Sequence, residues 1–173
     1  MKRIERLELS GPGTIGTIFK AQIVVESNFN VFAISPDAPC NVKEGWTGEE
    51  SRSFGLMQLT PACGWLKAAR LPDGRPNLER DASSELWSTS VFNPVVNVND
   101  GVQAMQIDRA EMKNTFPGCT EADYTQMTLA AFNQGGNSVT GCNQMSPAAA
   151  VYVAKIIGQY SVIASDAQWP NPY

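Results

Sequence analysis

The chain has 173 residues, a formal net charge of −4 and no histidine. The lack of histidine excludes Ser-His-Asp and Cys-His catalysis, and it excludes zinc sites of the HExxH kind. No GxxxxGK[ST] or GxGxxG loop occurs in the sequence, so a nucleotide site of either kind is not supported. Any acid–base chemistry must therefore use Asp, Glu, Tyr, Lys or Cys.

Hydrophobic residues make up 43% of the chain and charged residues 17%, which is enough apolar material for a folded core. We predict a single domain over residues 1–173, because domains commonly contain about 100–200 residues. The sequence has no basic run, which argues against a nucleic-acid partner. No apolar stretch is expected to span a membrane. We expect a monomer that needs no cofactor and no metal ion.

The first predicted elements are a helix and a loop. Pro12 and Gly13 precede a helix over about 14–29, which is apolar nearly all round and should be the central buried helix. Residues 35–55 are rich in Pro, Gly, Ser and charge, which is typical of a loop or a short hairpin. Short helices are predicted after Pro61 and over 83–89.

The second half of the chain predicts three further helices. Near-helical spacing of apolar residues predicts one face of the first; these residues are Val98, Val102, Met105, Ile107 and Met112. "TEAD" at 120–123 is a capping box that opens a helix through Phe132. Ser146 and Pro147 open the last helix in the favoured order. Its buried face is expected to hold Val151, Ala154, Ile157 and Tyr160.

Together these elements predict a mainly α fold. It is a helical bundle around a central buried helix, with at most a small β-element near 40–55.

Glu26 ends the apolar run of the first helix, in the stretch "VVESNFN". Apolar surroundings disfavour the charged form of a glutamate and raise its pKa. A glutamic acid that is still protonated near neutral pH can act as a general acid. A Glu26 that points to solvent from the helix end is the plainer alternative.

Three later segments carry amides and aromatic rings. They are "SFGLMQLTP" at 53–61, "LAAFNQGG" at 129–136 and "VYVAKIIGQY" at 151–160. Amides suit sugar hydroxyls and N-acetyl groups, and aromatic rings suit the faces of sugars. Each segment taken alone is equally compatible with core packing or with a helix C-cap.

Taken in order, these segments resemble the soluble lytic transglycosylase and goose-type lysozyme superfamily. The resemblance covers about residues 14–160 and includes "VES", "GLMQ", "AFNQGG", "YVAKIIGQY" and the helix "NVNDGVQAM". It implies a lysozyme-like α+β fold, with residues 1–173 as one catalytic domain. It also implies peptidoglycan glycan strands as the substrate and Glu26 as the catalytic acid. It also implies substrate-binding roles for further residues; these are Ser35, Met57, Gln58, Phe132, Asn133 and Tyr152.

Two departures from the family pattern bear on the reaction. Phe132 stands where the family usually has tyrosine. The segment between Ser35 and Gly55 is longer than in typical bacterial transglycosylases and looks goose-like, which makes Glu49 a candidate second carboxylate. Thr60 occupies the position of the lysozymes' other acidic residue, just after "GLMQ".

We therefore predict a lytic transglycosylase that forms a 1,6-anhydromuramic product. The first alternative is a goose-type lysozyme, a muramidase in which Glu49 positions water. The second alternative is an inactive cell-wall-binding module.

Four cysteines favour two disulfides and an oxidising compartment. Three pairings are open, and we favour Cys40 with Cys63 and Cys119 with Cys142; four buried thiols in a cytosolic protein are the alternative. The expected location is the periplasm, the cell wall or the extracellular space. Residues 1–13 show no apolar signal-peptide core, which favours a phage-encoded enzyme such as an endolysin.

Overall fold

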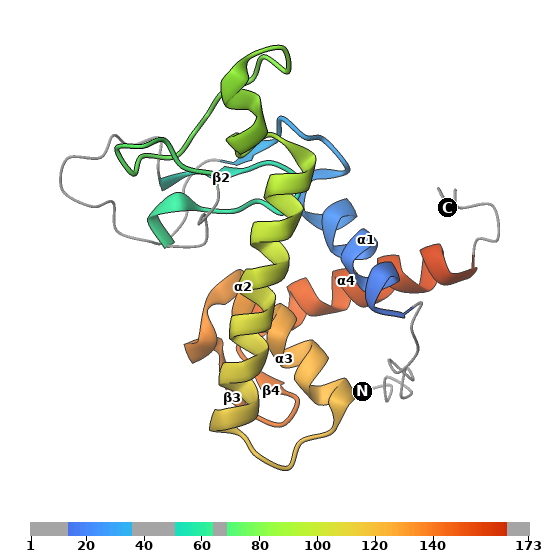
Figure 1. Cartoon of the computed structure of the whole chain (residues 1–173). Helices are drawn as coiled ribbons and strands as arrows, with labels where there is room; N and C mark the ends of the chain where they lie inside the picture. The colour runs from blue at the N-terminus through green and yellow to red at the C-terminus, as the bar shows by residue number, and fades with distance from the viewer. Residues whose placement is uncertain (1–13, 36–50, 64–68, 166–173) are drawn as a thin grey trace. The chain divides into compact units, whose positions relative to one another are not determined.

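The computed structural model describes residues 14–35, 51–63 and 69–165. The α-helices of the described part are α1 (Thr14–Ser27), α2 (Pro94–Thr115), α3 (Glu121–Gln134) and α4 (Pro147–Ser165) (Figure 1). The strands are β1 (Ile34–Ser35), β2 (Ser53–Phe54), β3 (Val139–Gly141) and β4 (Gln144–Met145). Short 3-10 helices are η2 (Pro61–Cys63), η3 (Glu85–Thr89) and η4 (Gly136–Ser138). The predicted mainly helical, lysozyme-like fold class is confirmed.

The chain divides into two compact units. Unit 1 contains residues 1–25 and 105–173, and unit 2 contains residues 26–104. The boundaries fall inside α1 and α2, so each of these helices contributes residues to both units. The assignment of residues 1–173 to one catalytic domain stays a prediction.

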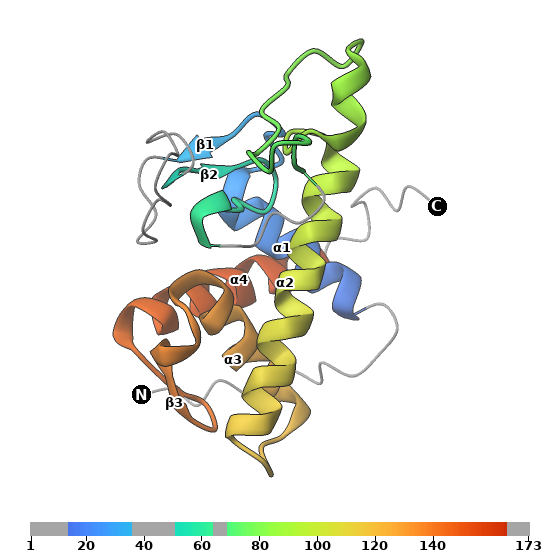
Figure 2. The same ribbon diagram turned by 60° about the vertical axis from the view of Figure 1, so that its left-hand side comes forward.

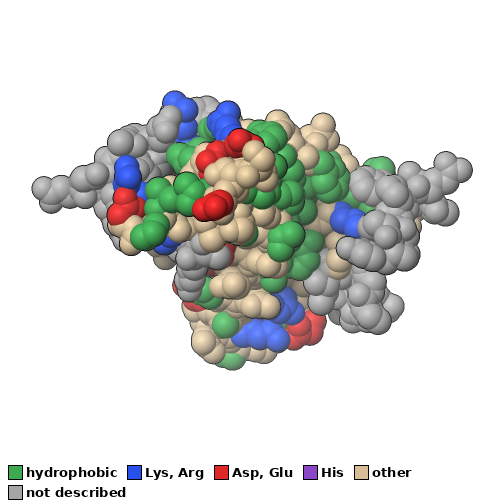
Figure 3. Space-filling view, turned by 45° about the horizontal axis from the view of Figure 1, so that its top comes forward, with side chains coloured by type: hydrophobic (Ala, Val, Ile, Leu, Met, Phe, Trp, Pro, Cys, Tyr) green, Lys and Arg blue, Asp and Glu red, His purple; other side chains and the backbone are tan. Residues whose placement is uncertain are grey.

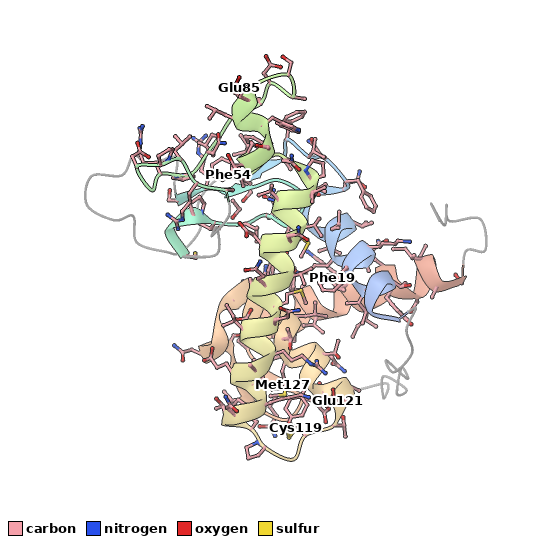
Figure 4. The ribbon with its side chains drawn as sticks, viewed as in Figure 1. Phe19, Phe54, Glu85, Cys119, Glu121 and Met127 are labelled. Atoms are coloured by element: carbon pink, nitrogen blue, oxygen red, sulfur yellow. A yellow bond between two sulfur atoms is a disulfide. The ribbon has the colours of Figure 1, made fainter. Side chains whose placement is uncertain are left out.

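In unit 1, α3 packs against α4 and against the small hairpin of β3 and β4. The predicted disulfide between Cys119 and Cys142 is present, and it ties the start of α3 to this hairpin. Figure 4 labels Cys119 at this end of the helix, together with Glu121 and Met127. Cys63 is also disulfide-bonded, and Cys40, its predicted partner, lies outside the described residues.

The predicted helix starts of unit 1 are confirmed. The Thr120 hydroxyl accepts a hydrogen bond from Asp123 N at 3.1 Å, and the Asp123 carboxylate accepts one from Thr120 N at 2.9 Å. This capping box satisfies two backbone donors that the helix cannot satisfy itself. Ser146 Oγ accepts from Ala149 N at 3.3 Å at the start of α4. α3 ends at Gln134, two residues beyond the predicted Phe132.

The predicted buried face of α4 is wrong. Val151 is 58% exposed and Ala154 is exposed, whereas Tyr152, Val153 and Ile156 are buried. Apolar residues occupy nearly every position between 147 and 157, so their spacing does not distinguish one face from the next.

α4 bears on the expectation that no apolar stretch spans a membrane. It has 19 residues and is long and apolar enough, by length and composition only, to cross a membrane. One such helix is weak evidence, because the core helix of a soluble protein passes the same test. α4 packs against α3, and 28% of its apolar 18-residue window is buried.

In unit 2, β1 and β2 form an antiparallel ribbon that pairs Ile34 with Phe54 and Ser35 with Ser53 (Figure 2). The strands therefore lie at the two ends of the predicted loop or hairpin over 35–55, whose middle lies outside the described residues. The Phe92 ring contacts Phe54 edge-on, with centroids 5.8 Å apart. The predicted short helices after Pro61 and over 83–89 are confirmed as η2 and η3.

The helix α2 buries a face that differs from the predicted one. Met105 and Met112 are buried as expected, but Ile107 is 44% exposed. The other buried positions of α2 are polar or small; they are Asn97, Asp100, Gly101, Ala104 and Asp108. A search for regularly spaced apolar residues misses this face, because about half of its residues are polar or glycine.

Asp108 is a buried carboxyl group on α2. Its side chain is 3% exposed, and Oδ2 has no hydrogen-bond partner among the described residues. Burial raises the pKa of Asp108 to about 7, and the nearby Glu111 charge raises it further in the same direction. The neighbouring cations Arg109 and Lys113 pair with Glu121 on α3.

Two features of the surface complete the fold. The prediction that α1 is buried nearly all round is wrong. Gly16 is exposed, and most positions after Ile23 in this helix are half-buried. On the face shown in Figure 3, acidic and basic side chains are interspersed among apolar ones.

Candidate active site

Glu26 is the penultimate residue of α1 and is half-buried. The helix ends at Ser27, and the next two residues adopt left-handed backbone conformations, with φ of 50° at Asn28 and 60° at Phe29. A hydrogen bond from Asn30 N to Ser27 O, 3.0 Å long, closes this turn. The chain therefore reverses immediately after the predicted acid.

Ala33 connects the segment that follows Glu26 with the "GLMQ" motif. Its carbonyl oxygen accepts a hydrogen bond from Gly55 N at 2.9 Å and another from Gln58 Nε2 at 3.3 Å. The β1–β2 ribbon extends the same connection by pairing Ser35 with Ser53. The structure thus brings Ser35 and Gln58 together with the segment after Glu26, all within unit 2.

We call residues 54–58 the Gln58 turn. Phe54 N and Leu59 O are hydrogen-bonded at 3.0 Å across the base of this turn, as are Leu59 N and Phe54 O. Gly55 and Gln58 have φ of 74° and 48°, so two of its residues lie in the left-handed region. Gln58 is half-buried and also donates to Gly55 O at 2.9 Å. Met57 is 0% exposed, which suits a role in supporting the turn.

Thr60 follows the Gln58 turn at the position where the lysozymes carry an acidic residue. Its hydroxyl is hydrogen-bonded to Ser53 Oγ at 2.7 Å, and the residue is 5% exposed. The segment 51–63 contains no Asp or Glu. Glu49, the candidate second carboxylate, lies outside the described residues.

The other predicted site residues belong to unit 1. Phe132 and Asn133 lie in the last turn of α3 and are half-buried. Asn133 Oδ1 accepts a hydrogen bond from Gln134 Nε2 at 2.7 Å. Tyr152 on α4 is buried, and its hydroxyl accepts from Gln22 Nε2 at 3.3 Å. Gln22 precedes Glu26 by four residues, which is about one helical turn of α1.

Sequence reasoning did not single out Asn97 on α2. This residue is 1% exposed and hydrogen-bonds to the backbone of the Gln58 turn. One signal in the sequence could have identified it: an asparagine stands between Val96 and Val98 in a predicted helix. An asparagine side chain in a helix competes for the hydrogen bonds of the backbone unless it has another partner. As to metals, no group of three His, Cys, Asp or Glu residues in the described part is placed to hold an ion.

Comparison with protein families places these motifs in a known class. The family model "Transglycosylase SLT domain" matches residues 12–152, which include α1, the Gln58 turn, α2 and α3. The chain therefore belongs to the transglycosylase SLT family, which acts on peptidoglycan outside the cytoplasm. Searches of curated proteins and of solved structures gave no significant match.

Proposed function

We propose that this protein is a lytic transglycosylase that cleaves the β-1,4 bond between N-acetylmuramic acid and N-acetylglucosamine in peptidoglycan. The family supports the polymer and the class of reaction. Glu26 supports the mechanism, since it is the acidic residue that the motif "VES" supplies at the end of α1. The proposed setting is the periplasm, the cell wall or the extracellular space, and a phage endolysin fits it.

The proposed mechanism uses one carboxyl group twice. Glu26 protonates the glycosidic oxygen as the bond from this oxygen to C1 of the muramic residue breaks. The resulting carboxylate then removes the proton from the 6-hydroxyl group of the same muramic residue as its oxygen bonds to C1. The ring closes as a 1,6-anhydro sugar, Glu26 regains its proton, and no water is consumed.

Thr60 is the observation that favours a transglycosylase over a hydrolase, and it leaves Glu49 as the carboxylate that a hydrolase would use. An inverting lysozyme needs a second carboxylate, about 6.5–9.5 Å from the acid, to activate water. At this family position the chain has a buried hydroxyl bonded to Ser53 instead. A neutral, occupied hydroxyl cannot act as a base on water near neutral pH.

Substrate-binding roles are proposed for residues of each unit by itself. In unit 2, the Gln58 amide and the Ser35 hydroxyl suit sugar hydroxyl and N-acetyl groups. In unit 1, Asn133 offers an amide and Phe132 a ring face, and Tyr152 is also proposed to bind substrate. Phe132 carries no hydroxyl, so any contact that the usual tyrosine hydroxyl would make is absent from this proposal.

Mass spectrometry of the digestion products tests the reaction directly. Purified peptidoglycan digested by the protein should release muropeptides with 1,6-anhydromuramic ends, which are lighter by one water than reducing ends. A digest that contains only reducing muramic ends would replace the proposal with a lysozyme. Release of no muropeptide at all would favour the wall-binding module.

Replacement of the acid tests its role. Glu26→Gln keeps the shape of the side chain and removes the transferable proton, so the rate should fall by at least about 10²–10⁴-fold. The circular dichroism spectrum and melting temperature should stay near those of the wild type. Activity within a few-fold of the wild type would remove Glu26 from the mechanism.

A further inference from the structure

The Asn97 side chain makes three hydrogen bonds with its two polar groups in the interior of unit 2. Oδ1 accepts a hydrogen bond from Met57 N at 2.7 Å. Nδ2 donates to Phe54 O at 3.0 Å and to Val91 O at 3.1 Å. An asparagine amide has two donor hydrogens, and both have partners. Since the residue is 1% exposed, water cannot replace these bonds.

Two of these bonds hold opposite ends of the Gln58 turn. Phe54 and Met57 lie 43 and 40 residues before Asn97, so hydrogen-bond partners for the backbone of the turn come from α2, a distant part of the chain. The turn needs such support because Gln58 has a φ of 48°, a conformation that is unfavourable for residues other than glycine. Unfavourable backbone conformations persist where the surroundings fix them.

The fit between α2 and the turn leaves no spare room. A Cβ atom on Gly55 would lie 2.4 Å from Asn97 Nδ2, and a Cβ atom on Gly101 would lie 2.8 Å from Met57 Cγ. Both distances are too short for real contacts. The two glycines therefore allow the amide and the methionine to approach the opposing backbone.

We propose that Asn97 is a positioning residue, which fixes the Gln58 turn so that the Gln58 side-chain oxygen is presented to substrate. The amide nitrogen of Gln58 already donates to Ala33 O and Gly55 O. The inference rests on the proposed function, because Gln58 acts on a glycan strand only if the protein does. Asn97 touches no substrate itself and acts through the backbone of Met57. Small errors in the placement of a binding group lower reaction rates strongly, by about 10²-fold for a displacement of about 1 Å.

Asn77 provides a matched control in the same unit. It is 2% exposed and also makes three side-chain hydrogen bonds, to Leu86 O at 2.7 Å, Thr89 Oγ1 at 3.0 Å and Glu79 N at 3.1 Å. All of its side-chain partners lie between 77 and 89, outside the Gln58 turn. Asn77→Ala should therefore destabilise the protein about as much as Asn97→Ala without disturbing the turn.

The test compares these two variants by three measurements. Melting temperatures should fall to a similar extent in both. Hydrogen exchange at the Met57 amide, followed by NMR, should become at least about tenfold faster in Asn97→Ala only, since that amide loses its acceptor. The rate of muropeptide release should fall by about 10- to 100-fold in Asn97→Ala and stay within about twofold in Asn77→Ala.

A double-mutant cycle with Gln58→Ala separates positioning from general destabilisation. If Asn97 acts through Gln58, Asn97→Ala should slow the Gln58→Ala enzyme by less than about twofold. Full additivity of the two losses would overturn the inference. So would unchanged Met57 exchange in an active Asn97→Ala protein.

A second variant keeps the test decisive if Asn97→Ala does not fold. Gly101→Ala pushes a Cβ atom against the buried Met57 side chain, so it should displace the Gln58 turn, slow muropeptide release and lower the melting temperature. Gly158→Ala is its control, because nothing lies within 4 Å of a Cβ atom there. Equal activity of Gly101→Ala and Gly158→Ala would overturn the inference. A wild-type protein that releases no muropeptide would overturn the proposed function itself, and the positioning role with it.

Discussion

Replacing Asp108 with asparagine should stabilise the protein at neutral pH, and the gain should grow as the pH rises. The side chain is 3% exposed on α2, and Oδ2 has no hydrogen-bond partner among the described residues. Burial, assisted by the Glu111 charge, raises the pKa of Asp108 from 3.8 to about 7. The folded protein therefore binds this proton more tightly than the unfolded chain does.

The sign and size of the effect follow from proton linkage. Between pH 4 and pH 7 the folded state holds more protons at this group than the unfolded state, so the free energy of unfolding falls as the pH rises. The difference between a pKa of 3.8 and one of about 7 corresponds to at most about 4 kcal/mol, at about 1.36 kcal/mol per pKa unit. Asparagine has the shape of the neutral acid and does not ionise. Asp108→Asn should thus match the wild type near pH 4 and exceed it by up to about 4 kcal/mol at pH 8.

Urea unfolding followed by circular dichroism, at pH values from 4 to 8, measures this difference. Other carboxylates titrate over the same range, but they do so in both proteins and cancel in the difference between the two curves. Glu111→Gln is the control, since it removes the weaker cause and leaves the buried carboxyl group; its gain should be smaller. A stability difference that does not change with pH, or that shrinks as the pH rises, would refute the reasoning.

Two further predictions concern the stability of unit 1. Thr120→Ala removes the N-cap of α3 and should lower the free energy of unfolding by about 1 kcal/mol, measured in urea at pH 7; no change would mean that the capping box contributes nothing. Cys119→Ser combined with Cys142→Ser removes a disulfide between cysteines that are 23 residues apart. The free energy of unfolding should fall by about 3.5 kcal/mol, because the unfolded chain regains the entropy that the closed loop had removed. A loss below about 1 kcal/mol would show that the unfolded chain is already restricted without the bridge.

The helix boundaries were the part of the fold that sequence alone predicted well. "TEAD" and Ser146–Pro147 specify helix starts through local hydrogen bonds, which need no knowledge of the rest of the chain. The buried face of each helix was predicted poorly, because it depends on what the helix packs against. In α4 nearly every position near its start is apolar, so spacing could not select Tyr152 over Val151.

The site was predictable where it depends on local motifs and unpredictable where it depends on distant contacts. "VES" and "GLMQ" identify Glu26 and Gln58 as candidates by residue type and order. The Asn97 contacts with the Gln58 turn join residues at least 40 positions apart, and no short motif contains both partners. The hairpin of β3 and β4 was also missed, because its strands are only two or three residues long.

The left-handed residues beside the candidate site limit how far this protein can be made heat-resistant. Four residues other than glycine have positive φ in the described part of the chain, and three of them, Asn28, Phe29 and Gln58, flank the predicted acid or belong to the Gln58 turn. Each such conformation is held at a cost of about 1–3 kcal/mol. Glycine at Asn28 or Phe29 would relieve part of it, yet would also loosen the chain reversal after Glu26. Laboratory selection for thermostability should therefore collect its substitutions elsewhere, at surface and capping positions, and leave these three residues unchanged.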